Sequence, residues 1–62
     1  MPHIMIDGPR LADLEKKRKL VEAMTAAAAE AYGMEKRAFT VTIRENDPTN
    51  VGVGGTLLCD RH

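Results

Sequence analysis

The sequence has few of the features that allow a small chain to fold on its own. It contains one cysteine, so a disulfide within one chain is excluded, and it has no tryptophan, one phenylalanine and one tyrosine to fill a core. A single core is marginal at 62 residues, and such small domains usually gain stability from disulfides, a metal ion or oligomerisation. Because 44% of the residues are nevertheless hydrophobic, we expect much of the apolar surface to be buried against other copies of the chain.

An excess of charge of either sign is also missing. The nine Lys and Arg residues balance nine Asp and Glu residues, which argues against a nucleic-acid-binding protein that relies on neutralising phosphates. The basic run 16–19 is interleaved with Glu15 and Glu22 at helical spacing, so it predicts a solvated helix face rather than an anion-binding patch. No secretory signal and no apolar stretch of about 18 residues is present. We therefore expect a cytoplasmic protein without a membrane partner.

Patterns typical of metal and nucleotide sites are absent from the sequence as well. Cys59, His3 and His62 do not show the paired spacing of zinc ligands, so we predict no metal site. The segment 51–55, Val-Gly-Val-Gly-Gly, is followed neither by the lysine of a phosphate loop nor by a dinucleotide fingerprint. It predicts a short hairpin or arm in close contact with another subunit. Glu45 has no paired partner in the sequence and is interpreted as an isolated carboxylate.

Two segments of the sequence have the alternation of β-strands. The first covers residues 3–7, with Ile4 and Ile6 on one face, and the segment 8–9, Gly-Pro, ends it. The second covers residues 38–45. Two strands joined by a long helix are expected to be parallel, with a right-handed crossover. Because two parallel strands do not make a stable sheet alone, their open edges are expected to pair with another subunit.

Between these strands the sequence has the periodicity of an amphipathic helix. The residues that recur at intervals of three or four are Leu14, Lys17, Val21, Met24, Ala28 and Tyr32. Asp13 is a suitable N-cap, and Gly33 stands where a left-handed C-terminal stop is expected. The alanines at 26–29 have high helix propensity and little bulk, so they allow close packing. The order of elements predicts an α+β fold in a single domain, residues 1–62.

Pro2 is the residue that points most directly to chemistry. Removal of Met1 would make its ring nitrogen a free secondary amine, whereas the nitrogen of any internal proline is a tertiary amide without a proton. An α-amino group titrates at roughly 7.7 to 8.0, close to the range in which a group can both accept and donate a proton at neutral pH. Proline at position two also simply favours the removal of Met1. Its neighbour His3 either tunes the amine electrostatically or is a partly buried strand histidine.

The combined pattern resembles the 4-oxalocrotonate tautomerase family of small β-α-β enzymes. The resemblance extends over nearly the whole chain and rests on Pro2 after Met1, Ile4 and Ile6, the turn 7–10 (Asp-Gly-Pro-Arg), Lys17 and Val21, the strand 41–45, and the segment 50–55. It implies that two subunits pair into a four-stranded sheet with two helices on one face. It also implies a homohexamer built as a trimer of dimers, with a dimer as the alternative.

The resemblance further implies an isomerase that needs no cofactor. Its terminal proline, here Pro2, would carry a proton between the dienol hydroxyl and a carbon of an unsaturated 2-hydroxy or 2-oxo dicarboxylate such as 2-hydroxymuconate, in the degradation of aromatic compounds. Another proline-dependent reaction on an unsaturated acid stays open: dehalogenation, hydration or phenylpyruvate tautomerisation. The remaining alternative is a non-catalytic oligomeric interaction module, which retention of Met1 would favour.

Three residues are implied as contacts of the small anionic substrate. Arg10 falls, with a short deletion before it, where the family has a carboxylate-binding arginine after the first strand. The family's arginine in the second strand corresponds to the uncharged Thr40. Arg44, on the same strand face, either compensates for it or is a solvent-facing arginine at the strand end. Val51 replaces a bulky aromatic residue of the family and is expected to line a smaller apolar wall.

Overall fold

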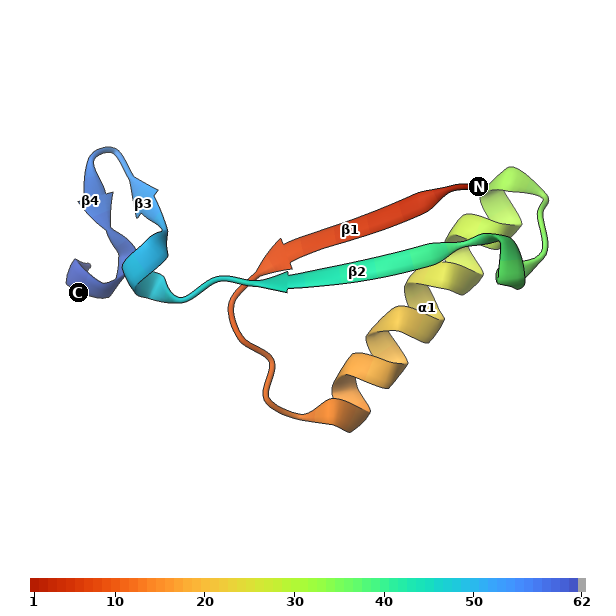
Figure 1. Cartoon of the computed structure of the whole chain (residues 1–62), viewed down its shortest axis with the longest axis horizontal. Helices are drawn as coiled ribbons and strands as arrows, with labels where there is room; N and C mark the ends of the chain where they lie inside the picture. Colours follow the sequence, from red (N-terminus) through yellow and green to blue (C-terminus); the bar gives the residue numbers. More distant parts are fainter. Residues whose placement is uncertain (62) are drawn as a thin grey trace.

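The computed structural model describes residues 1–61 and shows the predicted order of strand, helix, strand and hairpin (Figure 1). Its elements are β1 (His3–Gly8), α1 (Leu14–Tyr32), β2 (Thr40–Glu45), β3 (Gly52–Val53) and β4 (Thr56–Leu57). Short 3-10 turns lie at Lys36–Ala38, Pro48–Asn50 and Leu58–Asp60. His62, considered above as a zinc ligand, lies outside the described residues. The α+β class and the β-α-β arrangement are therefore confirmed.

The two long strands form a parallel pair whose register runs from His3 opposite Thr40 to Gly8 opposite Glu45. Side chains alternate between the two faces, as the period of a strand requires. The half-buried face consists of Ile4, Ile6, Val41 and Ile43. The opposite face is exposed, and it consists of His3, Met5, Asp7, Thr40, Thr42 and Arg44. Helix α1 covers one face of this sheet and leaves the other open (Figure 1).

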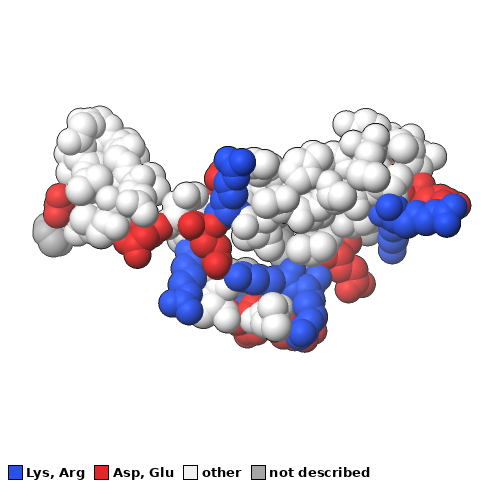
Figure 2. Space-filling view, in the orientation of Figure 1, with Lys and Arg blue, Asp and Glu red and all other residues white. Residues whose placement is uncertain are grey.

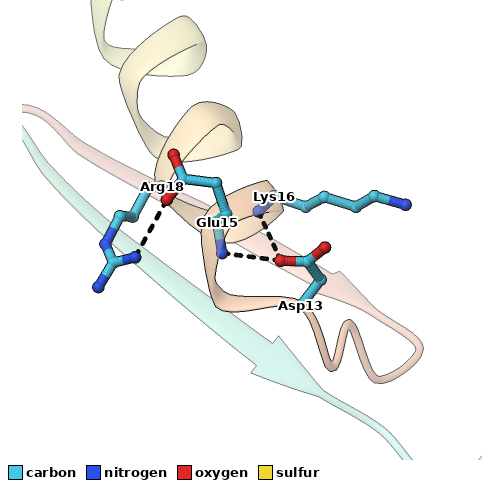
Figure 3. A network of polar contacts seen from close by, with 4 residues as sticks. All are labelled: Asp13, Glu15, Lys16 and Arg18. Atoms are coloured by element: carbon cyan, nitrogen blue, oxygen red, sulfur yellow. Dashed lines mark hydrogen bonds and ion pairs between the residues drawn. The ribbon is translucent and has the colours of Figure 1, made fainter.

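Both ends of α1 are fixed by the capping residues that the sequence predicts. The Asp13 carboxylate accepts hydrogen bonds from the backbone N–H groups of Glu15 (2.9 Å) and Lys16 (3.4 Å), as Figure 3 shows. These bonds satisfy donors that have no partner within the helix. At the other end Gly33 has φ of 65°, and the chain leaves the helix in the left-handed conformation. Both predicted caps are confirmed.

The second strand begins two residues later than the sequence pattern predicts. Ala38 belongs to the 3-10 turn, where its N–H donates to the carbonyl of Glu35 (3.0 Å), and Phe39 follows as the cap of that turn. Phe39 packs on Tyr32, with ring centroids 5.9 Å apart and planes tilted by 57°. Ala38 and Phe39 therefore belong to the turn that connects α1 to β2, although their alternation in the sequence is typical of a strand.

A glycine pair makes the turn of the C-terminal hairpin. Gly54 has φ of 61° and Gly55 has φ of 86°, a combination that other residues rarely adopt and that matches a two-residue hairpin turn. Gly52 pairs with Leu57 and Val53 with Thr56 in the antiparallel ladder. The hairpin projects away from the β1–β2 sheet (Figure 1). The predicted hairpin is thus confirmed, and it extends as an arm.

A single copy encloses almost no core. Phe39, with 9% of its surface exposed, is the one hydrophobic residue among residues 1–61 that counts as buried. Apolar residues of the predicted helix face remain open, since Leu14 is 58% and Tyr32 is 66% exposed. The radius of gyration is 14.9 Å, against about 11 Å for a compact chain of this length. The extended shape leaves a large apolar area without a partner within the chain.

None of the helices in the part of the chain that the structure describes is long and apolar enough to cross a membrane.

We predict that the protein is folded only as an oligomer. Burial of apolar surface is the main driving force of folding, and a single copy supplies too little of it to offset the loss of chain entropy. Sedimentation at micromolar concentration should therefore show an assembly and no folded monomer. On dilution below the dissociation range, the helical circular dichroism signal should be lost together with assembly. A monomer that melts cooperatively would contradict this prediction.

Candidate active site

Pro2 leads directly into β1 and is fixed by backbone pairing with β2. The Thr40 N–H donates to the Pro2 carbonyl at 3.2 Å, so the residue that carries the ring nitrogen lies beside the first residue of β2. Pro2 itself is half-buried. Met1 is 90% exposed, so the Met1–Pro2 bond is open to a processing enzyme. The Pro2 nitrogen, which becomes an amine when Met1 is removed, therefore lies at this end of the sheet, where the hydrogen bond from Thr40 holds the residue.

Next to Pro2, the open face of the sheet carries a polar pair. His3 Nδ1 and Thr40 Oγ1 lie 2.7 Å apart, across the first rung of the parallel ladder. His3 is exposed in a single copy, whereas the sequence-based alternative is a partly buried strand histidine. Its electrostatic influence on Pro2 stays a prediction.

Arg10 lies in the loop between β1 and α1, and a hydrogen bond to Glu45 holds this loop in place. The Glu45 carboxylate accepts a hydrogen bond from the Leu11 N–H at 2.6 Å, and its other oxygen lies 3.1 Å from the Lys17 ammonium. The strand ends are joined next to this contact, where the Asn46 N–H donates to the Gly8 carbonyl at 2.8 Å. The backbone on either side of Arg10 is therefore anchored to Glu45 and Asn46 at the end of β2, and Lys17 joins the same Glu45 carboxylate to α1.

The same contacts stabilise the charged form of Glu45. The hydrogen bond from Leu11 lowers the pKa of this carboxyl most, the contact with Lys17 comes next, and the positive charge of Arg10 contributes as well. Arg10 is exposed and forms no ion pair within residues 1–61. Its guanidinium is therefore available to an anion, while its loop is held in place.

Arg44 lies on the open face of the sheet, opposite Asp7 in the register. It is exposed and, like Arg10, has no ion pair in the described part of the chain. It lies four positions beyond Thr40, which corresponds to about 13 Å along a strand. Arg44 therefore does not occupy the space next to Thr40 and Pro2 within one copy.

Val51 lines a cleft of about 330 Å³ between the end of the sheet and the base of the hairpin. The cleft is lined by Asp7, Gly8, Pro9, Asn46, Pro48, Val51 and Leu58. Val51 is half-buried, and its carbonyl accepts a hydrogen bond from the Leu58 N–H at 2.8 Å. The hairpin is mostly uncharged, with acidic side chains at its base, while Lys and Arg side chains gather together with acidic ones over α1 and the strand ends (Figure 2). The contact of Val51 with a substrate stays a prediction.

The candidate residues fall at two opposite ends of the sheet. Arg10, Arg44 and the Val51 cleft belong to the end where β1 and β2 finish, while Pro2 lies where β1 begins. The six residues of β1 separate these ends, and this corresponds to about 20 Å. A six-carbon acid is shorter than that. One copy therefore does not assemble Pro2, Arg10 and Val51 into one site, and a site that used all of them would need more than one subunit.

The structure also identifies two functional candidates that the sequence does not. Glu45 is not the isolated carboxylate that the sequence suggests, because it binds Leu11 and Lys17. Lys17 is the sequence signal that could have indicated this contact, because it is the one charged residue on the apolar stripe of the helix. It is half-buried there, whereas its basic neighbours are exposed as predicted. Thr40 is recognisable in the sequence only as a missing arginine, since its contact with His3 depends on the strand register.

The family model described as "Tautomerase enzyme" matches residues 2–61. Solved structures with the same fold include DmpI from Archaeoglobus fulgidus, which is 49% identical, covers 95% of this chain and 100% of its own, and has a TM-score of 0.86. TomN, a 4-oxalocrotonate tautomerase homologue of the tomaymycin biosynthetic pathway, is 32% identical over 97% of this chain and 92% of its own, with a TM-score of 0.89.

A third structure is the heterohexameric 4-oxalocrotonate tautomerase from Chloroflexus aurantiacus J-10-fl. It is 29% identical, covers 100% of both chains and has a TM-score of 0.88. A search of curated proteins gives no match.

We predict that Glu45 links the stability of the assembly to pH. Because its pKa is lower in the folded protein than the ordinary value of 4.5, its contribution is complete above that value and is lost as the pH falls through the folded pKa. Chemical denaturation from neutral pH down to this range should show wild type losing its stability advantage over Glu45→Gln. Glu30→Gln is the matched control, since the Glu30 side chain forms no hydrogen bond or ion pair within residues 1–61. An advantage that stays constant with pH would contradict the assignment.

Proposed function

The chain belongs to the tautomerase enzyme family, among the homologues of 4-oxalocrotonate tautomerase, and from this we propose that it is an isomerase that acts through Pro2. The proposed reaction is the enol–keto tautomerisation of an unsaturated 2-hydroxy or 2-oxo dicarboxylate such as 2-hydroxymuconate. The observation that carries the proposal is Pro2 held at the start of β1, next to an exposed Met1, in a chain that matches the family from residue 2 to residue 61.

Removal of Met1 makes the Pro2 nitrogen a secondary amine with a lone pair. The amine takes the proton of the enol hydroxyl, the electrons of that bond move through the conjugated system, and the amine returns the proton to a carbon of the same molecule. The substrate and product are isomers, so the step needs no oxidant or co-reactant. An α-amino group can serve both half-reactions because it titrates close to neutral pH.

We further propose that Arg10, Arg44 and Val51 bind the substrate at a site shared between subunits. Guanidinium groups give paired donors to a carboxylate, and a dianionic acid needs such partners when it leaves water. The two arginines have no ion pair within residues 1–61, and Val51 supplies apolar surface in the cleft beside them. Their distance from Pro2 is the reason that we assign these two parts of the site to different copies.

The assembly that we propose is a homohexamer, a trimer of dimers, with a dimer as the smaller alternative. The open strand edges and the poorly buried helix face support an assembly, and one similar protein is a heterohexamer. We further propose a single domain, residues 1–62, and a location in the cytoplasm. A role in the degradation of aromatic compounds stays a prediction, and the similar protein TomN belongs to a biosynthetic pathway instead.

A second candidate activity is the tautomerisation of phenylpyruvate, which has one carboxylate. The strand positions next to Pro2 are His3 and Thr40, and neither is an arginine or lysine. This end of the site therefore offers less fixed positive charge than a dicarboxylate would use. Comparison of kcat/KM for the two substrates distinguishes the candidates, and dehalogenation or hydration of an unsaturated acid can be measured with the same preparation.

We predict that Pro2→Ala lowers kcat by about 100-fold or more, which is the usual contribution of a general acid–base group. Alanine leaves a primary amine at the chain terminus, so assembly should be retained. The assay follows the ultraviolet absorbance of 2-hydroxymuconate, and an intact-mass measurement establishes that Met1 is absent from both proteins. An unchanged kcat would remove Pro2 from the mechanism. A processed wild type without turnover on any of the unsaturated acids would favour the non-catalytic interaction module.

We predict that Arg10→Ala lowers kcat/KM by about 10-fold or more, because a charge-assisted contact with the substrate carboxylate is lost. The matched control is Arg18→Ala, which removes an exposed arginine that pairs with Glu15 on α1, at 3.1 Å. The control should stay within about twofold of wild type, since surface ion pairs contribute little. A loss of thermal stability without a change in kcat/KM would show that Arg10 is structural.

A further inference from the structure

The proposed reaction assigns no role to the pair formed by His3 and Thr40. The two residues open the parallel strands, and their side chains meet at 2.7 Å on the face that α1 leaves uncovered. The backbone joins the same two strands at this point, where the Thr40 N–H donates to the Pro2 carbonyl at 3.2 Å. The imidazole therefore belongs to the residue that directly follows Pro2, and Thr40 of the neighbouring strand β2 contacts it.

The contact with Thr40 decides which nitrogen of His3 can bind something else. When the Thr40 hydroxyl donates to Nδ1, the ring proton of a neutral imidazole lies on Nε2. No other hydrogen bond to His3 occurs within residues 1–61, and the side chain is exposed. The charged residues on this face, Asp7 and Arg44, lie at the other end of the sheet. With the Thr40 hydroxyl as the donor, the pair presents an Nε2–H that is unused within residues 1–61, on the residue that follows Pro2 in the sequence.

We propose that His3 contacts the substrate and that Thr40 positions it. In this inference, which rests on the proposed function, Nε2–H donates a hydrogen bond to the substrate oxygen from which Pro2 removes the proton. Negative charge builds up on that oxygen as the proton moves to the amine, and a donor fixed in advance stabilises it. The imidazole keeps its own proton, and Pro2 returns the transferred proton to carbon. The substrate class is an enol of a 2-oxo acid.

Variants of the two residues and of a neighbouring threonine test this assignment in the processed, assembled protein. His3→Leu removes the donor and should lower kcat/KM with 2-hydroxymuconate or phenylenolpyruvate by about tenfold. His3→Gln restores an N–H donor near the Nε2 position and should recover part of the loss. Thr40→Val should cause a smaller loss, and the double variant with His3→Leu should be no worse than His3→Leu alone, because Thr40 acts through His3. Thr42→Val is the matched control on the same open face of β2 and should leave kcat/KM unchanged.

A spectroscopic measurement separates this role from a structural one. Nitrogen NMR shifts of the His3 ring should show the Nε2–H form in wild type and a mixture of tautomers in Thr40→Val, while sedimentation and thermal melting stay the same. An active wild type with an equally active His3→Leu variant would overturn this inference and leave the proposed function intact. The inference would also be overturned if Thr40→Val lowered kcat/KM by the same factor in the His3→Leu background as in wild type. A processed wild type without turnover would instead overturn the proposed function, and the inference with it.

Discussion

The pairing of β1 with β2 is the interaction on which the rest of the structure depends. Its register places His3 beside Thr40 at one end and Gly8 beside Glu45 at the other. The first contact lies next to Pro2, and the second lets the Glu45 carboxylate reach the loop that carries Arg10. A slip of one residue would send every strand side chain to the opposite face. It would break both contacts at once and expose the isoleucines that face α1.

Features with a local cause could be predicted from the sequence. Asp13 and Gly33 mark the two ends of α1 because a cap needs only its own side chain or backbone conformation and the adjacent turn. The glycines of the hairpin turn are predictable for the same reason, since positive φ excludes most other residues. The start of β2 was not predictable from alternation, because packing between Phe39 and Tyr32 competes with the strand pattern there. That packing joins residues from two different elements.

The candidate site was predictable only in part, because its chemistry depends on residues that are far apart in the sequence. Pro2 stands out by its position alone. The role of Glu45 depends on Leu11 and Lys17, which reach it only after the helix has folded back along the sheet. The contact between His3 and Thr40 likewise joins residues 37 positions apart. A charged residue on an apolar helix stripe, as at Lys17, is the kind of sequence signal that indicates such a distant partner.

The length of β1 has a consequence for how this protein can evolve. Its six residues keep Pro2 and Arg10 too far apart to act together within one copy. In the shared site that we propose, each chain contributes two half-sites, and a single mutation in its gene alters every site of the proposed symmetric assembly at once. Gene duplication relaxes this restriction, because two diverged copies can each keep one half-site and change the other. A chain of 62 residues can in this way produce several different sites from the combination of a few related subunits.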